Sequence, residues 1–157
     1  MNNIYKISCI FLFSISCMSA FATEENIYRG LGKGAAQFPD FKTLQQKGLI
    51  PNKPTVSRAD YNDVYQFKKP YQFLGQNFVL LFDEYMSEYA GCCVNEGWGA
   101  IFAKASDLKQ IQQFAQRNQC KIEKMDLESK YYYGYEVKKL AKNKEYYELS
   151  CRENDVE

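Results

Sequence analysis

The sequence predicts an α+β fold in which a small antiparallel sheet of about four to six strands packs one face against one main helix and is held by disulfides. Three features indicate this fold. Residues 78–82 form a short apolar run, residues 107–118 have apolar side chains at helical spacing, and four of the six cysteines remain once a leader is removed. Alternating strand and helix units, which a doubly wound nucleotide-binding fold needs, are missing from the pattern.

The first 22 residues have the features of a secretory signal peptide. Lys6 gives a positive start, an apolar stretch follows it, and Ala20 and Ala22 are the small residues of a cleavage site before Thr23. The apolar stretch is shorter than the ~20 residues of a membrane-spanning helix. We therefore expect an exported chain, periplasmic or secreted, with no membrane span after cleavage.

A lipid anchor is the alternative, because Cys17 could become the first residue of a lipoprotein. Lipoprotein leaders usually carry leucine three residues before that cysteine, and the residue here is Ser14. The sequence favours cleavage after Ala22 and leaves lipidation of Cys17 open.

The composition limits what the chain binds. It has 20 Lys and Arg against 19 Asp and Glu with no basic run, so electrostatic binding to nucleic acid is not expected. Of the cysteines outside the leader, Cys92 and Cys93 are adjacent rather than spaced as zinc ligands. The chain has no histidine, which also disfavours a zinc site but leaves oxygen-only metal sites open. No motif indicates a metal or a cofactor, so we expect neither.

Glycine and proline recur through residues 23–69. This predicts a loop-rich lead-in with at most a short helical turn at residues 41–47. The α+β core of the same single domain is expected over residues 70–157. Within it, residues 78–82 favour a central strand buried on both faces. Asn95, Glu96 and Gly97 indicate the turn of a hairpin between strands at residues 92–94 and 98–102.

The main helix is predicted over residues 107–118. Ser106 is a favourable N-cap, and Asp107 suits the positive end of the helix dipole. Four apolar residues recur at helical spacing and form the expected buried stripe: Leu108, Ile111, Phe114 and Ala115.

A second hairpin is predicted near the C-terminus, with a three-residue loop at residues 142–144. This loop would bring three pairs opposite each other, two apolar and one of opposite charge: Val137 with Leu149, Tyr135 with Cys151, and Lys138 with Glu148. A two-residue loop breaks the pattern. With the three-residue loop, Tyr146 would lie on the sheet face opposite Leu149 and Cys151.

Four cysteines are expected to form two disulfides in an oxidising compartment: Cys92, Cys93, Cys120 and Cys151. Adjacent strand residues point to opposite faces, so Cys92 and Cys93 should bond different partners, one to Cys120 and the other to Cys151. The spacing does not say which pairs with which. A bond between Cys92 and Cys93 is the strained alternative, and it would leave the other two cysteines to pair.

The absence of histidine excludes Ser-His and Cys-His catalysis and the common zinc hydrolase sites. Carboxylates around the predicted central strands, chiefly Asp83 and Glu96 together with Glu84 and Glu88, could act on a glycan as an acid–base pair. Acidic residues at strand ends and turns are more often simply solvated, so a non-enzymatic function is favoured.

The chain has 13 tyrosines, several of them in runs at residues 131–135 and 146–147. Strand alternation cannot bury every tyrosine of such runs, so some should lie on the outer face of the sheet, where tyrosine is typical of binding surfaces. We predict that Tyr132 and Tyr146 belong to such a surface, together with the loop residues Asn95, Glu96 and Trp98. A single Trp in a small domain is equally suited to the core.

These features predict an exported, non-enzymatic protein-binding domain, most concretely a periplasmic inhibitor or immunity-type antagonist of an enzyme or toxin. Its partner is another protein, which the sequence does not identify. One alternative is a histidine-free envelope hydrolase that acts on glycan through carboxylates. The other is a structural subunit of an envelope assembly.

Export makes a testable prediction. Mass spectrometry of the protein from its native cell envelope should find Thr23 at the N-terminus, because the small residues before it are what signal peptidase recognises. An intact Met1, or a lipid on Cys17, would contradict cleavage after Ala22.

Overall fold

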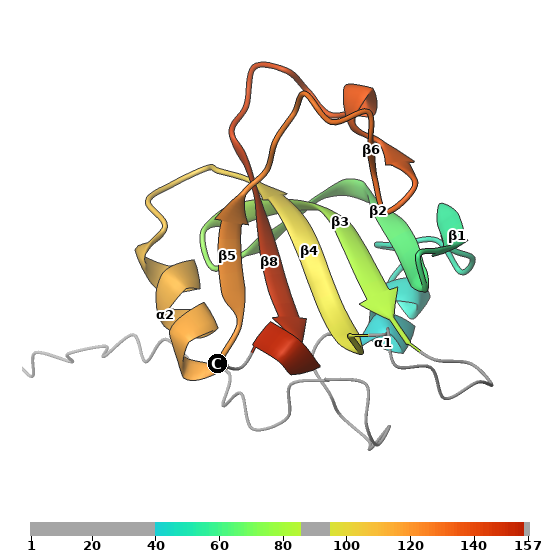
Figure 1. Cartoon of the computed structure of the whole chain (residues 1–157), viewed down its shortest axis with the longest axis horizontal. Helices are drawn as coiled ribbons and strands as arrows, with labels where there is room; N and C mark the ends of the chain where they lie inside the picture. The colour runs from blue at the N-terminus through green and yellow to red at the C-terminus, as the bar shows by residue number, and fades with distance from the viewer. Residues whose placement is uncertain (1–39, 86–94, 156–157) are drawn as a thin grey trace, which may run out of the picture.

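The computed structural model describes residues 40–85 and 95–155, which build a six-stranded antiparallel sheet with strand order β1-β2-β3-β4-β8-β5 (Figure 1). A second sheet contains two short strands, β6 and β7. The strands are β1 (Val56–Ala59), β2 (Asn62–Phe73), β3 (Gln76–Glu84), β4 (Gly97–Ala103), β5 (Lys121–Lys124), β6 (Tyr131–Tyr132), β7 (Tyr135–Glu136) and β8 (Tyr146–Arg152). The helices are α1 (Phe41–Gln46), α2 (Lys109–Arg117) and the 3₁₀ turns η1 (Val137–Lys139) and η2 (Glu153–Asp155). The antiparallel sheet and the single main helix confirm the predicted α+β class.

The short helix α1 lies where the sequence predicted a helical turn. Asp40 caps it by accepting a hydrogen bond from the Thr43 amide at 2.9 Å. The rest of the predicted loop-rich stretch is different, because β1 and most of β2 lie within it. Their connecting turn contains neither Gly nor Pro. Asp60 and Tyr61 themselves adopt the positive φ angles that a tight hairpin needs.

The strand predicted at residues 78–82 is the core of β3, which lies in the interior of the sheet between β2 and β4. Its pairing with β4 shifts between Phe78 and Leu80, so one irregularity interrupts the alternation. Phe78 and Leu81 pack on one face of the sheet, while Leu80 and Phe82 pack on the other. The prediction of burial on both faces is confirmed.

The main helix is α2, two residues shorter at its start than predicted. Ser106 does not cap it: its hydroxyl donates to the Gly75 carbonyl at 3.0 Å. The Asp107 carboxylate instead accepts the Lys109 amide at 2.9 Å. The buried stripe is confirmed at Ile111, Phe114 and Ala115.

The predicted C-terminal hairpin is wrong. Strand β8 lies between β4 and β5, and it pairs with both. Tyr135 pairs with Tyr132 in the small β6–β7 hairpin, and Val137 begins η1, so neither faces β8. The local pattern of apolar and charged pairs favoured pairing of β8 with the segment just before it in the chain. An interior position instead gives β8 two hydrogen-bonded edges and buries both of its faces.

The hairpin predicted around Asn95 is only partly within the described residues. Its second strand corresponds to β4, which begins at Gly97 and pairs with β3 and β8. Its first strand, at residues 92–94, lies outside the described residues.

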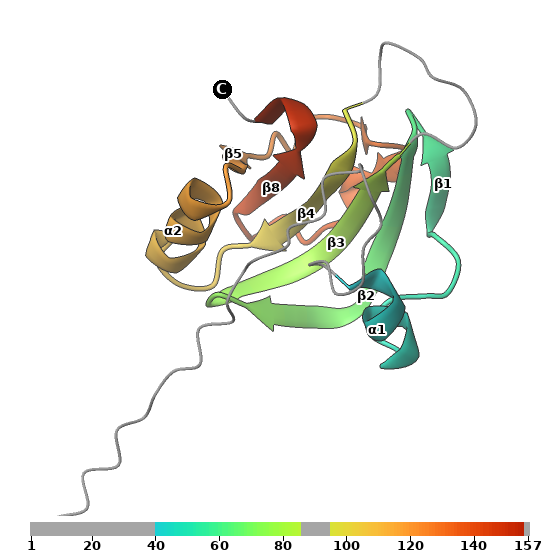
Figure 2. The same cartoon turned by 90° about the horizontal axis from the view of Figure 1, so that it is seen from below.

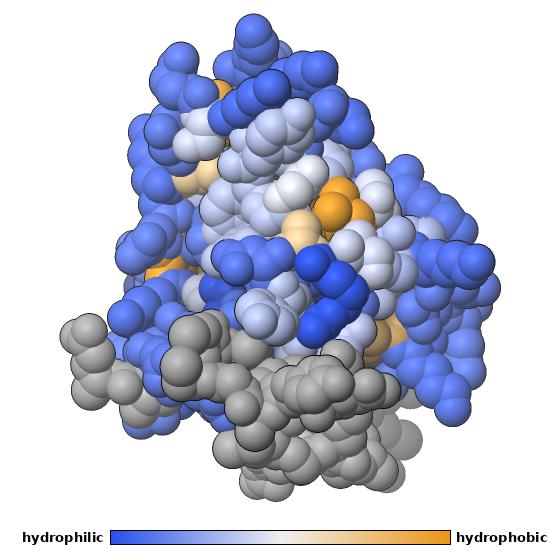
Figure 3. Space-filling model, turned by 45° about the vertical axis from the view of Figure 1, so that its right-hand side comes forward, coloured by the Kyte–Doolittle hydropathy of each residue, from blue (hydrophilic) through white to orange (hydrophobic). Residues whose placement is uncertain are grey.

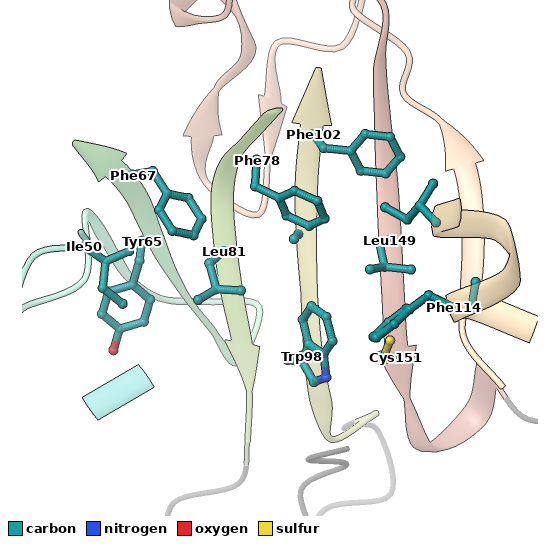
Figure 4. Close-up of a cluster of buried hydrophobic side chains, with 13 residues drawn as sticks. Ile50, Tyr65, Phe67, Phe78, Leu81, Trp98, Phe102, Phe114, Leu149 and Cys151 are labelled. Atoms are coloured by element: carbon teal, nitrogen blue, oxygen red, sulfur yellow. The ribbon is translucent and has the colours of Figure 1, made fainter. Parts of the chain in front are cut away.

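The two faces of the sheet carry separate hydrophobic clusters. We call the first the helix face, because α1 and α2 cover parts of it (Figure 2). Trp98, Phe102 and Leu149 point from the sheet toward this side (Figure 4). We call the second the hairpin face, because side chains of β6, β7 and η1 pack on it, among them Tyr135 and Val137. Because side chains pack on both faces of the sheet, less of its surface is open than the sequence analysis predicted for the tyrosine runs.

Cys120 and Cys151 form a disulfide with a Cα–Cα distance of 4.4 Å. Both of the pairings expected with Cys92 and Cys93 are therefore wrong, because each required Cys120 and Cys151 to bond elsewhere. The reason is the strand register: Lys121 pairs with Ser150, so Cys120, which directly precedes β5, lies beside Cys151 of β8. Cys92 and Cys93 lie outside the described residues.

Loss of this disulfide should weaken the fold substantially. The double variant Cys120→Ala/Cys151→Ala releases a closed loop with a sequence separation of 31 residues. Chain entropy then predicts a loss of about 3–4 kcal/mol in the free energy of unfolding, measured by urea denaturation. Wild-type protein unfolded with reductant is the matched comparison. Labelling of Cys120 or Cys151 by a thiol reagent without prior reduction would contradict the bond.

Candidate functional site

Alternation along β8 separates polar from apolar side chains. Leu149 and Cys151 belong to the core of the helix face. Glu148, Ser150 and Arg152 point to the hairpin face. There they line a depression of about 250 Å³. Two residues of β5 and two nearby residues complete the lining: Lys121, Glu123, Tyr133 and Asp155.

Arg152 lines this depression and is only 5% exposed. Its Nε lies 2.9 Å from Oε2 of Glu84, the last residue of β3. Its Nη1 lies 3.2 Å from Oε1 of Glu148 and donates to Ser150 Oγ at 2.7 Å. The two carboxylates neutralise a guanidinium that could not otherwise be buried.

Aromatic rings hold the same guanidinium from the sides. The ring centroids of Phe82 and Tyr133 lie 5.0 and 5.1 Å from its central carbon. Phe82 occupies the space beside Gly99, where a Cβ atom would come within 2.0 Å of the Phe82 ring. Glycine at position 99 is therefore needed for the ring that supports Arg152.

Glu148 is a partly buried carboxylate of the site. Burial raises its pKa, and the neighbouring Arg152 opposes this rise. The Tyr132 hydroxyl donates a hydrogen bond to its second oxygen. The charges of Glu123 and Asp155 raise the pKa further, and Glu123 lies directly opposite Glu148 in the pairing of β5 with β8.

The charged network also contacts the residues that directly precede β4. Glu84 Oε1 accepts a hydrogen bond from the Asn95 amide at 3.0 Å. The Asn95 side chain accepts the Asn154 amide at 2.8 Å, and the Glu96 carbonyl accepts the Glu153 amide at 2.9 Å. Asn95 and Glu96 thus belong to a rigid stem beside β8.

The β1–β2 turn lies at the end of the sheet where β3 ends. Arg58 Nη1 donates to the carbonyls of Tyr61 and Tyr85, both at 2.8 Å. Its guanidinium lies 4.3 Å from the Tyr85 ring centroid and 5.7 Å from that of Tyr61. Arg58, Asp60 and Tyr61 all have positive φ angles, so this turn is strained and held in one shape by these contacts.

Tyr61 is 47% exposed, and in the described part of the chain the only other large apolar side chain with comparable exposure is Tyr131, at 50%. The face on which β1 and β6 come forward is mostly hydrophilic, with a small apolar group near its centre (Figure 3). Tyr133 lines the depression, and the next residue, Gly134, lies against β1, because a Cβ atom there would come within 2.8 Å of the Ala59 side chain. The β6–β7 turn therefore links the depression to the strand that leads into the β1–β2 turn.

The structure separates the residues that the sequence predicted as a binding surface. Trp98 is 1% exposed and Tyr146 is 3% exposed, so both are core residues, on opposite faces of the sheet. Tyr146 does lie opposite Leu149 and Cys151, but the β6–β7 hairpin and η1 share the hairpin face with it. Its hydroxyl accepts the Ala141 amide at 3.0 Å. Both rings pack within the hydrophobic clusters of the sheet.

Asn95 and Tyr132 are brought together indirectly. Asn95 bonds Glu84, Tyr132 bonds Glu148, and Arg152 joins the two carboxylates. Sequence reasoning missed Arg152 itself, although the alternation of Glu148, Ser150 and Arg152 with Leu149 and Cys151 indicated a polar stripe on one face of a strand.

The predicted acidic cluster is divided between the two faces. Glu84 is paired with Arg152 on the hairpin face, and its neighbour Asp83 points to the other side. Asp83 lies opposite Asp63 in the β2–β3 register, and both charges help raise the pKa of Tyr65, after burial, to about 12. Glu88 lies outside the described residues.

A second hollow, of about 220 Å³, lies on the helix face between α1 and the sheet. Apolar side chains from α1 and strands β2 to β4 line most of it, among them Leu44, Phe67, Phe78, Leu81 and Trp98. Its lining is suited to an apolar group. Trp98 thus contacts a hollow rather than the open surface.

Comparison with protein-family models, with curated proteins and with solved structures finds no match for this chain. In residues 40–85 and 95–155, no group of three or more cysteine or acidic side chains is placed to hold a metal ion. No helix in these same ranges is long and apolar enough to cross a membrane.

Removal of the central guanidinium should be costly. Arg152→Ala leaves Glu84 and Glu148 buried without their cation, and we expect a loss of about 3–5 kcal/mol in the free energy of unfolding. Lys104→Ala is the matched control, because its ion pair with Glu145 is exposed and should leave that free energy nearly unchanged. Urea denaturation of both variants measures the difference. Equal, small losses would show that the Arg152 network does not hold the fold.

Proposed function

We propose that this protein is an exported, non-enzymatic binding domain that recognises another protein. Its most concrete form is a periplasmic inhibitor or immunity-type antagonist of an enzyme or toxin. Export rests on the leader at residues 1–22, and a disulfide such as Cys120–Cys151 is typical of exported proteins. The recognition surface that we propose is the region formed by the β1–β2 turn and the neighbouring depression.

The observation that carries this proposal is the exposed Tyr61 on a rigid turn. Arg58 bridges the two sides of this turn with its hydrogen bonds and stacks against Tyr85. A tyrosine that is already held in place loses little conformational entropy when a partner covers it. Tyrosine and arginine are also the residues in which interface energy tends to concentrate.

The depression also supports recognition over catalysis. Glu148 accepts hydrogen bonds from Tyr132 and Arg152, and Asp155 accepts them from the Ser150 hydroxyl at 2.7 Å and the Arg152 amide at 2.6 Å. These hydrogen bonds hold both carboxylates in fixed positions. A preformed arrangement of this kind suits the recognition of a partner.

A second candidate function is glycan hydrolysis, which one observation favours. Glu148 has a raised pKa and faces Glu123 across two strands, which is the kind of pair that acid–base hydrolysis uses. If this function holds, Glu148→Gln should abolish release of sugar fragments from purified peptidoglycan. Under the binding proposal, wild-type protein and this variant both release none.

The binding proposal predicts unequal effects for two equally exposed tyrosines. Tyr61→Ala should weaken affinity for the partner by about 2 kcal/mol, or about 30-fold, because it removes an aromatic anchor. Tyr131→Ala, the control, should change it little, since Tyr131 lies in β6 rather than in the β1–β2 turn. Calorimetry with the product of an adjacent toxin or enzyme gene measures both.

Two results would count against the proposed surface. One is an equal affinity for wild-type protein and Tyr61→Ala. The other is a matching loss in Tyr131→Ala. Thermal unfolding of both variants must first show unchanged stability, so that lost affinity is not a consequence of unfolding.

A further inference from the structure

The charges of the depression do not balance. Among the described residues, three carboxylates line it, from Glu123, Glu148 and Asp155, and a fourth, Glu84, pairs with Arg152. Two cations from the same part of the chain line it, Lys121 and Arg152. The chain as a whole has 20 basic and 19 acidic residues, so the surplus of negative charge belongs to this site and not to the protein in general.

The strand register places part of this surplus where it opposes folding. Glu123 and Glu148 face each other directly, and like charges in that position destabilise a pair of strands. A neutral or basic residue at position 123 would relieve the repulsion. Strand β5 is at the edge of the sheet, so Glu123 projects beside an open side of the depression, and it is exposed.

The same site already accommodates one guanidinium. Arg152 is bound between two carboxylates and beside the rings of Phe82 and Tyr133. Each carboxylate oxygen can accept more than one hydrogen bond, so Glu148 and Asp155 keep acceptor capacity toward the depression. A hollow of about 250 Å³ with a tyrosine wall and surplus carboxylates matches a flat cation.

We infer that the depression between β5 and β8 receives a basic side chain of the partner protein, with an arginine guanidinium bound between Glu123 and Glu148. This inference rests on the proposed protein-binding function and specifies the chemistry of the partner. The partner's cation would screen the Glu123–Glu148 repulsion and contact Asp155. Tyr133 would cover one side of it, next to the β1–β2 turn that carries Tyr61.

The inference can be tested without the partner. N-acetyl-L-arginine amide is titrated into the full mature protein, and backbone amide shifts are followed by NMR. We expect saturable shifts confined to residues 121–124, 133 and 148–155. N-acetyl-L-citrulline amide has the same shape but no charge, and it should give no saturable shifts there. N-acetyl-L-lysine amide tests whether any cation suffices, and we expect it to bind more weakly than the arginine probe.

Matched variants identify the carboxylate involved. Glu123→Gln keeps the shape of the side chain, does not touch the Arg152 ion pairs, and should weaken arginine binding about three- to ten-fold. Glu128→Gln removes the same charge from an exposed residue outside the depression, and it should leave binding unchanged.

The inference is overturned if the citrulline probe binds as well as the arginine probe. It is equally overturned if Glu123→Gln and Glu128→Gln have the same effect, or if no shifts saturate at these residues. Failure here is distinguishable from failure of the proposed function. A protein that binds its partner through Tyr61 but ignores the arginine probe contradicts only the inference, and one that binds the probe but no partner contradicts only the function.

Discussion

A guanidinium buried in the hairpin face must be neutralised, and the elements around Arg152 are arranged to do this. Glu84 comes from the end of β3, Glu148 from β8, and the Tyr133 ring from the β6–β7 turn. Ion pairs and hydrogen bonds are directional and a hydrophobic contact is not, so this network orients segments that strand pairing and apolar packing also hold. Gly99 is part of the same arrangement, since it leaves room for the Phe82 ring beneath the guanidinium.

The two clusters of the sheet explain where a binding surface can lie. Helices cover parts of one face, and the β6–β7 hairpin with η1 covers part of the other. Large aromatic residues such as Trp98 and Tyr146 are therefore buried in the core. Among the described residues, two places that stay accessible are the end of the sheet at the β1–β2 turn and the charged depression beside β5. These places combine an exposed tyrosine with fixed charges, and both are held by hydrogen bonds rather than by loose packing.

Sequence reasoning succeeded where a pattern depends only on neighbours along the chain. The apolar run of β3 and the helical spacing of Ile111 and Phe114 were enough to place an interior strand and the main helix. It failed for β8, because the pairing of Tyr135 with Cys151 satisfied the local pattern as well as the true pairing does. The candidate site was harder still. Arg152 reads as one charged residue near the end of the chain until Glu84, 68 positions earlier, is placed beside it.

The sequence by itself determined the α+β class, the two elements with clear periodicity and the presence of cysteines suited to a disulfide. Only the tertiary structure decided that Cys120 bonds Cys151, that β8 lies between β4 and β5, and that Trp98 and Tyr146 are buried. The reason is physical. Periodicity follows from the geometry of a single element, whereas strand order, disulfide pairing and the burial of a charge depend on contacts between residues far apart in the chain, which many registers satisfy locally and one satisfies throughout.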